Sequence, residues 1–225
     1  MAERHLGLLL QHLDVDCVLD VGAHYGEFAN VIRGTGWSGR LISFEPQSSC
    51  RKELERQAAL DPAWSVLPIA LSDQEGMVRL ALRAASTFTS LNEHRPESMI
   101  TAVPGIKEML DVVGYEEIQR RRLDTLLDEV PGPRPERIFL KIDTQGHDEA
   151  VITGATGVLH RIVALQLELT QDPLYHSTSN YINVIQTLDR LGFAFNATFP
   201  VVKDPRSLAM LEFDGIFVRR QVAPT

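Results

Sequence analysis

Short apolar runs alternate with stretches of helical spacing along the chain, and this alternation predicts an α/β fold. The apolar runs have the length of buried strands and fall at residues 17–19, 40–45, 64–71, 137–143, 163–169, 193–199 and 213–218. Segments with the apolar period of a helix fall at residues 6–13, 27–33, 48–60, 147–154 and 181–191. We therefore expect a mainly parallel sheet with helices on both faces. Asp214 and Gly215 are expected to interrupt the last strand.

The stretch between the third and fourth runs departs from this pattern. Residues 76–82 alternate weakly and predict an extra strand, residues 115–121 are expected to be extended, and residues 123–127 predict a short helix. Residues 84–114 have no clear period. A long irregular insert in a compact domain is usually a lid or a binding loop. We expect one domain over residues 1–225, with this insert facing the substrate.

The first apolar run leads into a glycine turn, which marks the expected ligand site. Asp20, Gly22 and Gly26 form a D-x-G-x-x-x-G pattern between strand and helix, and such sheets bind ligands at the carboxyl ends of their strands. Ala23 and His24 follow Gly22, so the G-x-G-x-x-G fingerprint of NAD sites is absent. S-adenosylmethionine has no pyrophosphate, and its cationic groups suit Asp20. Gly22 would let the chain pass close to it, and Ala23 and His24 would line its pocket.

A second acid ends the next predicted strand. Glu45 lies there with Pro46 directly after it, where an acidic residue can bind the ribose diol of an adenosine ligand. The alternative is that Asp20 and Glu45 are ordinary acids at strand ends. At the end of the third run, Ser72 or Asp73 is expected to bond the adenine amino group, although both residue types are also common in turns.

Candidates for proton transfer lie at the ends of the later strands. Asp143 ends the strand expected beside the first one, and it could act as a base, as a metal ligand, or as a carboxylate that stabilises the following helix. His147 and Glu168 are further catalytic candidates. In a metal-dependent alternative, Asp143, Glu168 and either His147 or Asp148 would surround a magnesium ion. No tight cluster with clear ligand spacing is present, so no metal ligand is predicted.

Composition limits the class of protein. The chain has 225 residues, 44% hydrophobic and 23% charged, with a net charge of −8. This charge argues against nucleic acid or an anionic membrane as the main partner. Cys17 and Cys50 are the only two cysteines, which favours a reducing cytoplasm over a disulfide framework. No apolar run has the length of a membrane span. The oligomeric state stays open, with a homodimer as one possibility.

The ordered motifs resemble one known family, the FkbM S-adenosylmethionine-dependent methyltransferases. The matching blocks are 18–23 with Gly26, 43–46, 69–73 before Gly76, 122–124, 139–146, 149–154 and 214–217. The resemblance implies a class I methyltransferase (Rossmann-like) fold, whose seven-stranded sheet has an antiparallel last strand. It also implies O-methylation of natural products or sugars, with Asp20, Gly22, Gly26, Glu45 and Asp143 as functional positions. Gln145 stands where many members have Glu.

These observations predict an S-adenosylmethionine-dependent O-methyltransferase acting on a hydroxyl of a small molecule. Two alternatives stay open. One is a metal-dependent O-methyltransferase, and the other is a subunit that binds S-adenosylmethionine without turning it over. The residues do not select the acceptor.

Overall fold

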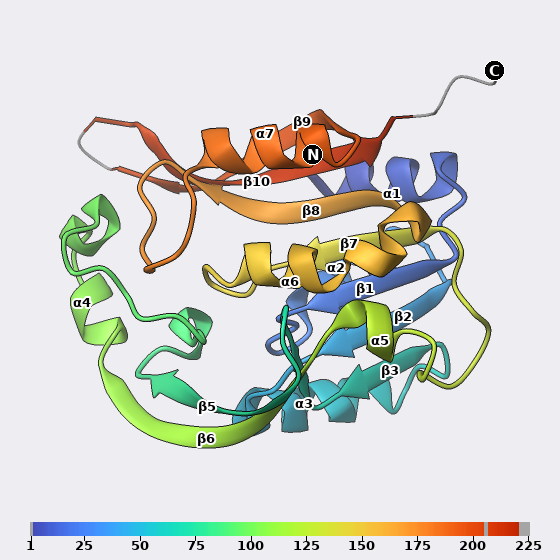
Figure 1. Cartoon of the computed structure of the whole chain (residues 1–225), viewed down its shortest axis with the longest axis horizontal. Coiled ribbons are helices and arrows are strands. Elements are labelled where there is room, and N and C mark those ends of the chain that lie inside the picture. The colour runs from blue at the N-terminus through green and yellow to red at the C-terminus, as the bar shows by residue number, and fades with distance from the viewer. Residues whose placement is uncertain (1, 205–206, 221–225) are drawn as a thin grey trace.

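The computed structural model describes residues 2–204 and 207–220 and has a main sheet between two layers of helices (Figure 1). Within these residues the main sheet has seven strands in the order β3-β2-β1-β7-β8-β10-β9. Their bounds are β1 Cys17–Val21, β2 Arg40–Phe44, β3 Trp64–Leu67, β7 Ile138–Ile142, β8 Ile162–Thr170, β9 Phe193–Lys203 and β10 Met210–Arg219. Strand β10 runs antiparallel to both of its neighbours, β8 and β9. The predicted seven-stranded, mainly parallel sheet with an antiparallel last strand is confirmed.

The helices that cover the main sheet pack apolar side chains against it. On one face, α1 (Ala2–His12), α2 (Glu27–Gly34) and α3 (Ser48–Ala58) bury Leu10, Ile32 and Leu54. The other face is covered by α5 (Leu123–Leu126), α6 (Asp148–Gly154), the 3-10 helix η3 (Thr156–Arg161) and α7 (Tyr181–Arg190). Both cores consist of buried apolar side chains, so burial of the central strands is the main source of stability. Among the described residues, no helix is long and apolar enough to cross a membrane.

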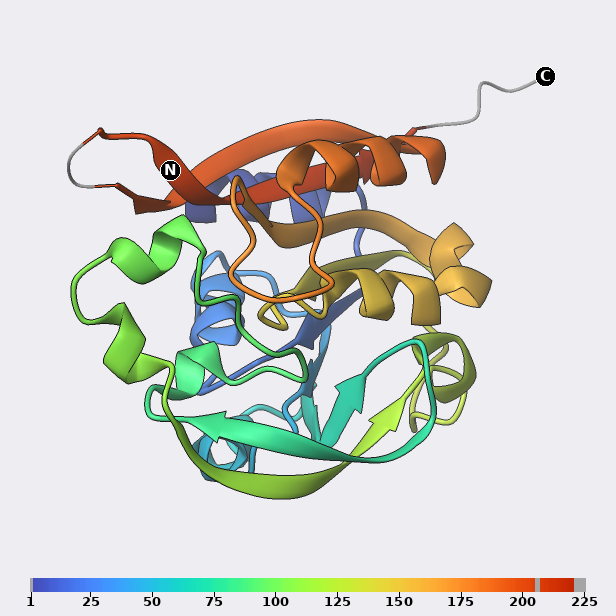
Figure 2. The same cartoon turned by 60° about the vertical axis from the view of Figure 1, so that its left-hand side comes forward.

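The third predicted strand, over residues 64–71, is wrong as a single element. It divides at Pro68 into β3 and β4 (Ile69–Leu71), which belong to different sheets. Proline has no backbone N–H to donate to a neighbouring strand, so it ends the pairing of β3 with β2. Strand β4 instead pairs with β6 (Val112–Arg121), and β6 pairs with β5 (Gly76–Arg83), which gives a small second sheet (Figure 2).

The last predicted strand is not interrupted. Strand β10 continues through Asp214 and Gly215, and Gly215 lies directly opposite Leu167 of β8. A Cβ atom at Gly215 would lie 2.6 Å from a side-chain carbon of Leu169. The glycine therefore leaves room for this leucine in the core rather than breaking the strand.

The irregular insert contains three short helical turns. They are η1 (Ser86–Phe88), η2 (Met99–Ala102) and α4 (Ile106–Met109). Ile100 and Leu110 of the insert pack with Leu174, Tyr175 and Leu211 in a small separate core. Figures 1 and 2 show this green segment beside the ends toward which the parallel strands point. Cys17 and Cys50 are both free and buried.

Candidate active site

Four neighbouring strands each carry one buried polar residue at the same level of the main sheet. The register places Asp20 of β1 opposite Ser43 of β2 and Lys141 of β7, and it places Lys141 opposite Gln166 of β8. Ser43 and Asp20 are fully buried, and Lys141 and Gln166 are 7% and 8% exposed. Buried polar groups are retained only where they are paired or functional. We call these four residues the polar row.

Lys141 is the centre of the polar row. Its Nζ lies 3.2 Å from Asp20 Oδ1 and 3.4 Å from Asp143 Oδ2, and it donates to the carbonyl oxygen of Gly22 at 3.1 Å. Burial lowers the pKa of Lys141, but the two carboxylates outweigh burial and hold this pKa above its ordinary value. The ammonium therefore stays charged and joins β1, the loop over residues 22–26 (the glycine loop) and the end of β7.

Asp20 lies behind the cavity rather than on its wall. Burial raises its pKa, and the charge of Lys141 opposes that increase. Its Oδ2 accepts a hydrogen bond from Ser43 at 3.4 Å, and Ser43 in turn accepts one from Trp64 Nε1 at 3.0 Å. Asp20 is fully buried and is not among the residues that line the cavity. Asp20 therefore meets the cavity through Lys141, which does line the wall.

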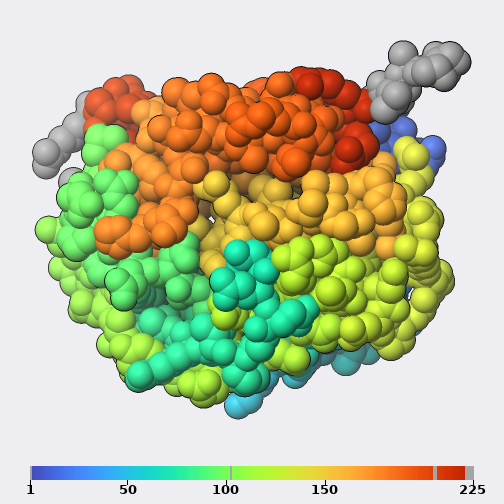
Figure 3. All heavy atoms as spheres, viewed as in Figure 1, coloured from blue at the N-terminus to red at the C-terminus, as the bar shows by residue number. Residues whose placement is uncertain are grey.

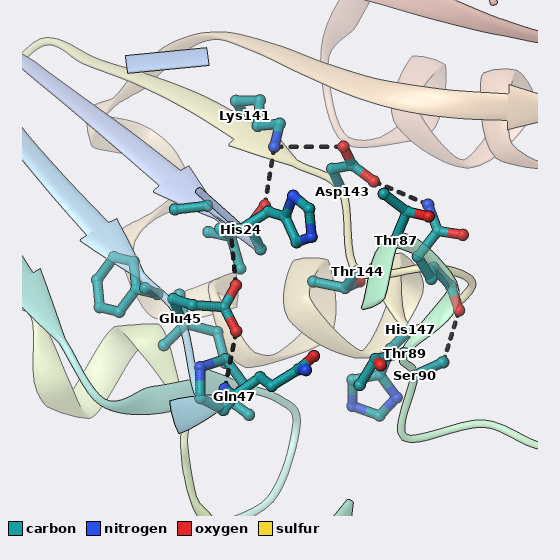
Figure 4. A pocket seen from close by; sticks show the side chains of 18 of the residues that line it. His24, Glu45, Gln47, Thr87, Thr89, Ser90, Lys141, Asp143, Thr144 and His147 are labelled. Atoms are coloured by element: carbon teal, nitrogen blue, oxygen red, sulfur yellow. Dashed lines mark hydrogen bonds and ion pairs between the residues drawn. The ribbon is translucent and has the colours of Figure 1, made fainter. Parts of the chain in front are cut away.

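A cavity of about 480 Å³ lies at the carboxyl ends of the strands, within the size range of small-molecule sites. Its walls come from the glycine loop, the ends of β2 and β7, strand β4 and the insert. Figure 4 shows Glu45 and Gln47 on one side of it, with Thr87, Asp143 and His147 on another. Figure 3 shows the insert (green) packed against the segment 171–180 (orange) on the outside of this region.

Gly22 lies at a close backbone contact and on the wall of the cavity. Gly22 has φ 72°, and a Cβ atom there would lie 2.0 Å from the carbonyl oxygen of Asp143. The close approach of the Asp143 backbone thus requires a glycine here, and Gly22 also lines the cavity. Gly26 has φ 92° and packs against Leu54 and Trp64, outside the cavity wall. Ala23 and His24 do line the cavity.

Glu45 is held in one orientation at the end of β2. Its Oε2 accepts a hydrogen bond from the backbone N–H of His24 at 2.8 Å, and its Oε1 accepts one from the N–H of Gln47 at 2.7 Å. His24 has φ 50°, which is rare for a non-glycine residue and aims its N–H at the carboxylate. Burial raises the pKa of Glu45 to about 7, against the effect of these two hydrogen bonds. Glu45 and Pro46 both line the cavity.

The raised pKa of Glu45 predicts a pH-dependent stability. Glu45 binds its proton more tightly in the folded chain, with a pKa of about 7, than at its ordinary value of 4.5. The folded state therefore loses stability as the pH rises through this interval, by about 2 kcal/mol between pH 5 and pH 7 for this one group. Urea unfolding of the wild type and of Glu45→Gln at both pH values measures the difference. Identical pH dependence in the two proteins would contradict the assignment.

Ser72 and Asp73 do not line the cavity, in contrast to their expected contact with adenine. Ser72 is fully buried, and its hydroxyl bonds Asp73 Oδ1 at 3.1 Å and His147 Nε2 at 3.0 Å. The apolar residues just before them, Ile69, Ala70 and Leu71, line the cavity instead. This wall offers apolar side chains against which a purine could pack.

His147 lines the cavity, but both of its ring nitrogens are engaged. Nδ1 lies 3.2 Å from Asn92 Oδ1, and Nε2 lies 3.0 Å from the Ser72 hydroxyl. Asn92 donates its amide to Gly146 O, so its oxygen faces Nδ1 of the ring. Burial lowers the pKa of His147, which favours the neutral ring. The structure therefore gives His147 a structural bridge between the insert and β4 rather than a free nitrogen for catalysis.

Asp143 and Gln145 line the cavity, while Glu168 lies behind Gln145 and outside the wall. The Gln145 amide donates to Asp143 Oδ1 at 3.1 Å and reaches Glu168 Oε2 at 3.5 Å, and its oxygen accepts from the Tyr175 hydroxyl at 3.2 Å. Burial and the neighbouring Glu212 raise the pKa of Glu168 well above its ordinary value. Of the three predicted catalytic residues, Asp143 alone offers a carboxylate to the cavity.

No group of three or more His, Cys, Asp or Glu side chains with metal-binding geometry occurs within residues 2–204 and 207–220. Asp148, a possible metal ligand, instead accepts hydrogen bonds from the backbone N–H and the hydroxyl of Thr144. Burial raises its pKa to about 6. The side chain thus caps the turn that leads from Asp143 into α6.

The insert is attached to the cavity wall on two sides. The Ser86 hydroxyl lies 2.7 Å from His24 Nε2, which joins η1 to the glycine loop. On the other side, Ser90 donates to the carbonyl oxygen of Gln145 at 2.6 Å, and Asn92 donates to that of Gly146 at 2.7 Å. The segment between these attachments covers the cavity, and Thr87 and Thr89 add hydroxyl groups to its wall.

Lys141, Gln166 and Asp214 are wall residues that were not predicted as site residues. A sequence signal for the first two exists. Both strands place a polar residue between two apolar ones, as Leu140-Lys141-Ile142 and Leu165-Gln166-Leu167. A polar residue inside a strand buried on both faces calls for a partner or a ligand.

The family model for the methyltransferase FkbM domain matches residues 20–195. The chain belongs to the FkbM methyltransferase domain family. That match confirms the family resemblance drawn from the motifs, and it covers the glycine loop, Glu45 and Asp143. No curated protein sequence matches the chain.

Solved structures share the fold of this FkbM domain at low identity. The FkbM methyltransferase from Methylobacillus flagellatus KT has 13% identity and a TM-score of 0.56, over 91% of this chain and 44% of its own. The FkbM domain described here thus spans less than half of that protein. Magnesium protoporphyrin IX methyltransferase from Synechocystis PCC 6803, solved with bound S-adenosylmethionine, has 9% identity and a TM-score of 0.51, over 97% and 77% of the two chains. An rRNA methylase from Streptococcus thermophilus has 9% identity and a TM-score of 0.50, over 96% and 95%.

Proposed function

We propose that this FkbM domain binds S-adenosylmethionine in the cavity and transfers its methyl group to a hydroxyl of a small molecule. The observation that carries the proposal is the position of Glu45, whose carboxylate is fixed by two backbone N–H groups on the cavity wall. A carboxylate at the end of the second strand is suited to accept hydrogen bonds from a ribose diol. The apolar wall of Ile69, Ala70 and Leu71 would hold the adenine.

The rest of the cavity fits the amino-acid end of the cofactor. Strand order places Asp143, at the end of β7, two strands away from Glu45 at the end of β2. The glycine loop between them follows β1 and lacks the glycine that a pyrophosphate would need, because His24 occupies that position. An adenosine with a short cationic extension therefore suits this wall better than a dinucleotide does.

Bound S-adenosylmethionine supplies a methyl group that its sulfonium already activates, so the protein has to align the acceptor and take up a proton. Asp143 is the residue that would accept the proton of the acceptor hydroxyl, because its carboxylate faces the cavity and its side chain is 42% exposed. Lys141 holds Oδ2 and Gln145 holds Oδ1 of this carboxylate, which fixes its direction. The insert, attached through Ser86 and Ser90, would exclude water and face the acceptor.

Transfer of labelled methyl from S-adenosylmethionine to a panel of small polyols, sugars and phenols tests the proposal. We expect labelled product with the wild type and a rate about 100-fold lower with Asp143→Asn, which cannot accept the proton. Affinity for S-adenosylhomocysteine should change less than about threefold in that variant, since Glu45 is untouched. An unchanged rate in Asp143→Asn removes the proposed role of Asp143. A protein that binds neither form of the cofactor refutes the function.

A further inference from the structure

The cavity has a second polar end, away from Glu45. Asp214 and Gln166 line this end, from β10 and β8. Strands β1, β7 and β8 separate β10 from β2, which Glu45 follows. Asp214 lies opposite Glu168 in the register, and Gln166 lies opposite Ile216, so the side chains of Asp214 and Gln166 emerge on the same face of the sheet. We call this pair the far-end pair.

The far end of the cavity is negatively charged. Lys141 is the only cation among the cavity-lining residues that the structure describes, and its three N–H bonds are directed to Gly22, Asp20 and Asp143. Against this single positive charge stand the carboxylates of Asp20, Asp143 and Asp214. The field at this end therefore disfavours an anionic group and favours a cation.

Gln166 adds an acceptor that needs a donor. Its side chain is next to Asp214, and its Oε1 is buried without a hydrogen-bond partner among the described residues. A buried amide oxygen without a donor costs free energy, so such groups call for a ligand or a partner. Burial and the nearby Asp143 raise the pKa of Asp214 to about 6, against the opposing effects of Gln166 and Lys141. A second positive charge would relieve this repulsion.

We propose that the far-end pair binds an ammonium group, with Asp214 as its counter-ion and Gln166 Oε1 as a second acceptor. An ammonium group offers several N–H donors to these oxygens and neutralises the excess of carboxylates. This inference rests on the proposed function. The group has two possible sources within it, the α-ammonium of the cofactor or an amine on the acceptor.

The test compares the wild type with Asp214→Asn and with the matched control Glu212→Gln. Glu212 lies on the same strand but outside the cavity wall. Calorimetry measures the affinity for S-adenosylhomocysteine and for 5′-methylthioadenosine, which lacks the amino-acid part. With S-adenosylhomocysteine bound, glucosamine and glucose are then compared as a matched amine and hydroxyl pair. Thermal unfolding checks that each variant is folded.

If the cofactor supplies the ammonium, Asp214→Asn should weaken S-adenosylhomocysteine binding about tenfold or more and leave 5′-methylthioadenosine within about twofold. If the acceptor supplies it, glucosamine should bind the wild type more tightly than glucose does, and Asp214→Asn should remove this difference. Glu212→Gln should change neither the affinity for S-adenosylhomocysteine nor the difference between glucosamine and glucose. If Asp214→Asn changes the binding of neither S-adenosylhomocysteine nor glucosamine, the subsite is overturned and the proposed function stands. A wild type that binds neither nucleoside overturns the proposed function and the subsite with it.

Discussion

Replacing Lys141 by Met is expected to destabilise the protein by about 3–5 kcal/mol, the usual cost of leaving a buried charge without its partner. The methionine side chain fills nearly the same space, so the cost comes from charge rather than from a cavity. Asp20 is fully buried, and Lys141 is its only cationic partner among the described residues. Urea unfolding at neutral pH, with the midpoint and the slope both fitted, measures this loss.

Two further variants separate the charge effect from a general effect of losing a lysine. Lys52→Met, on the exposed side of α3, should change the stability by less than about 0.5 kcal/mol. The double variant Lys141→Met with Asp20→Asn should recover much of the loss, because it removes the uncompensated carboxylate. If Lys141→Met alone were as stable as the wild type, the polar row would have no structural importance.

The second large effect is expected at Glu45, where Gln should weaken S-adenosylhomocysteine binding about 100-fold. Two contributions combine in this loss. First, the ribose diol loses a charged acceptor. Second, the carboxylate of Glu45 accepts from the backbone N–H groups of His24 and Gln47, and the NH₂ group of Gln would face one of these donors with another donor. Calorimetry with S-adenosylhomocysteine measures the affinity, and circular dichroism checks the fold.

Glu27→Gln is the matched control for this experiment. Glu27 also lines the cavity and also contacts His24, but its side chain is 65% exposed at the rim. Its replacement should change the affinity by less than about threefold, because exposed charges contribute little. Equal losses in the two variants would show that general acidity of the cavity, rather than the fixed position of Glu45, determines binding.

Local patterns predicted the elements well wherever a strand or a helix is decided by its own residues. The runs over residues 40–45 and 137–143 became β2 and β7 because each is apolar and buried on both faces. The error at residues 64–71 had a local signal, since Pro68 cannot donate within a strand. The strand through Gly215 was harder, because the glycine accommodates Leu169, which lies 46 positions earlier.

The positions of the site acids depend on contacts that are distant in sequence. Asp20 looked like a ligand contact, but Lys141 covers it from another strand. His147 looked like a possible base, but Asn92 from the irregular insert and Ser72, just after β4, contact its two ring nitrogens. Such partners become visible only when the insert and both sheets are placed together. Glu45 was predictable because its two N–H partners lie in the neighbouring loops that the motif itself defines.

The central claim is that the cavity holds an adenosyl cofactor with its ribose on Glu45. A crystal structure of the protein grown with S-adenosylhomocysteine tests this most directly. We expect the ribose hydroxyls to bond the carboxylate of Glu45, the adenine to lie against Ile69 and Leu71, and the sulfur to face Asp143. A nucleoside bound elsewhere, or a cavity that stays empty at saturating ligand, would contradict the claim.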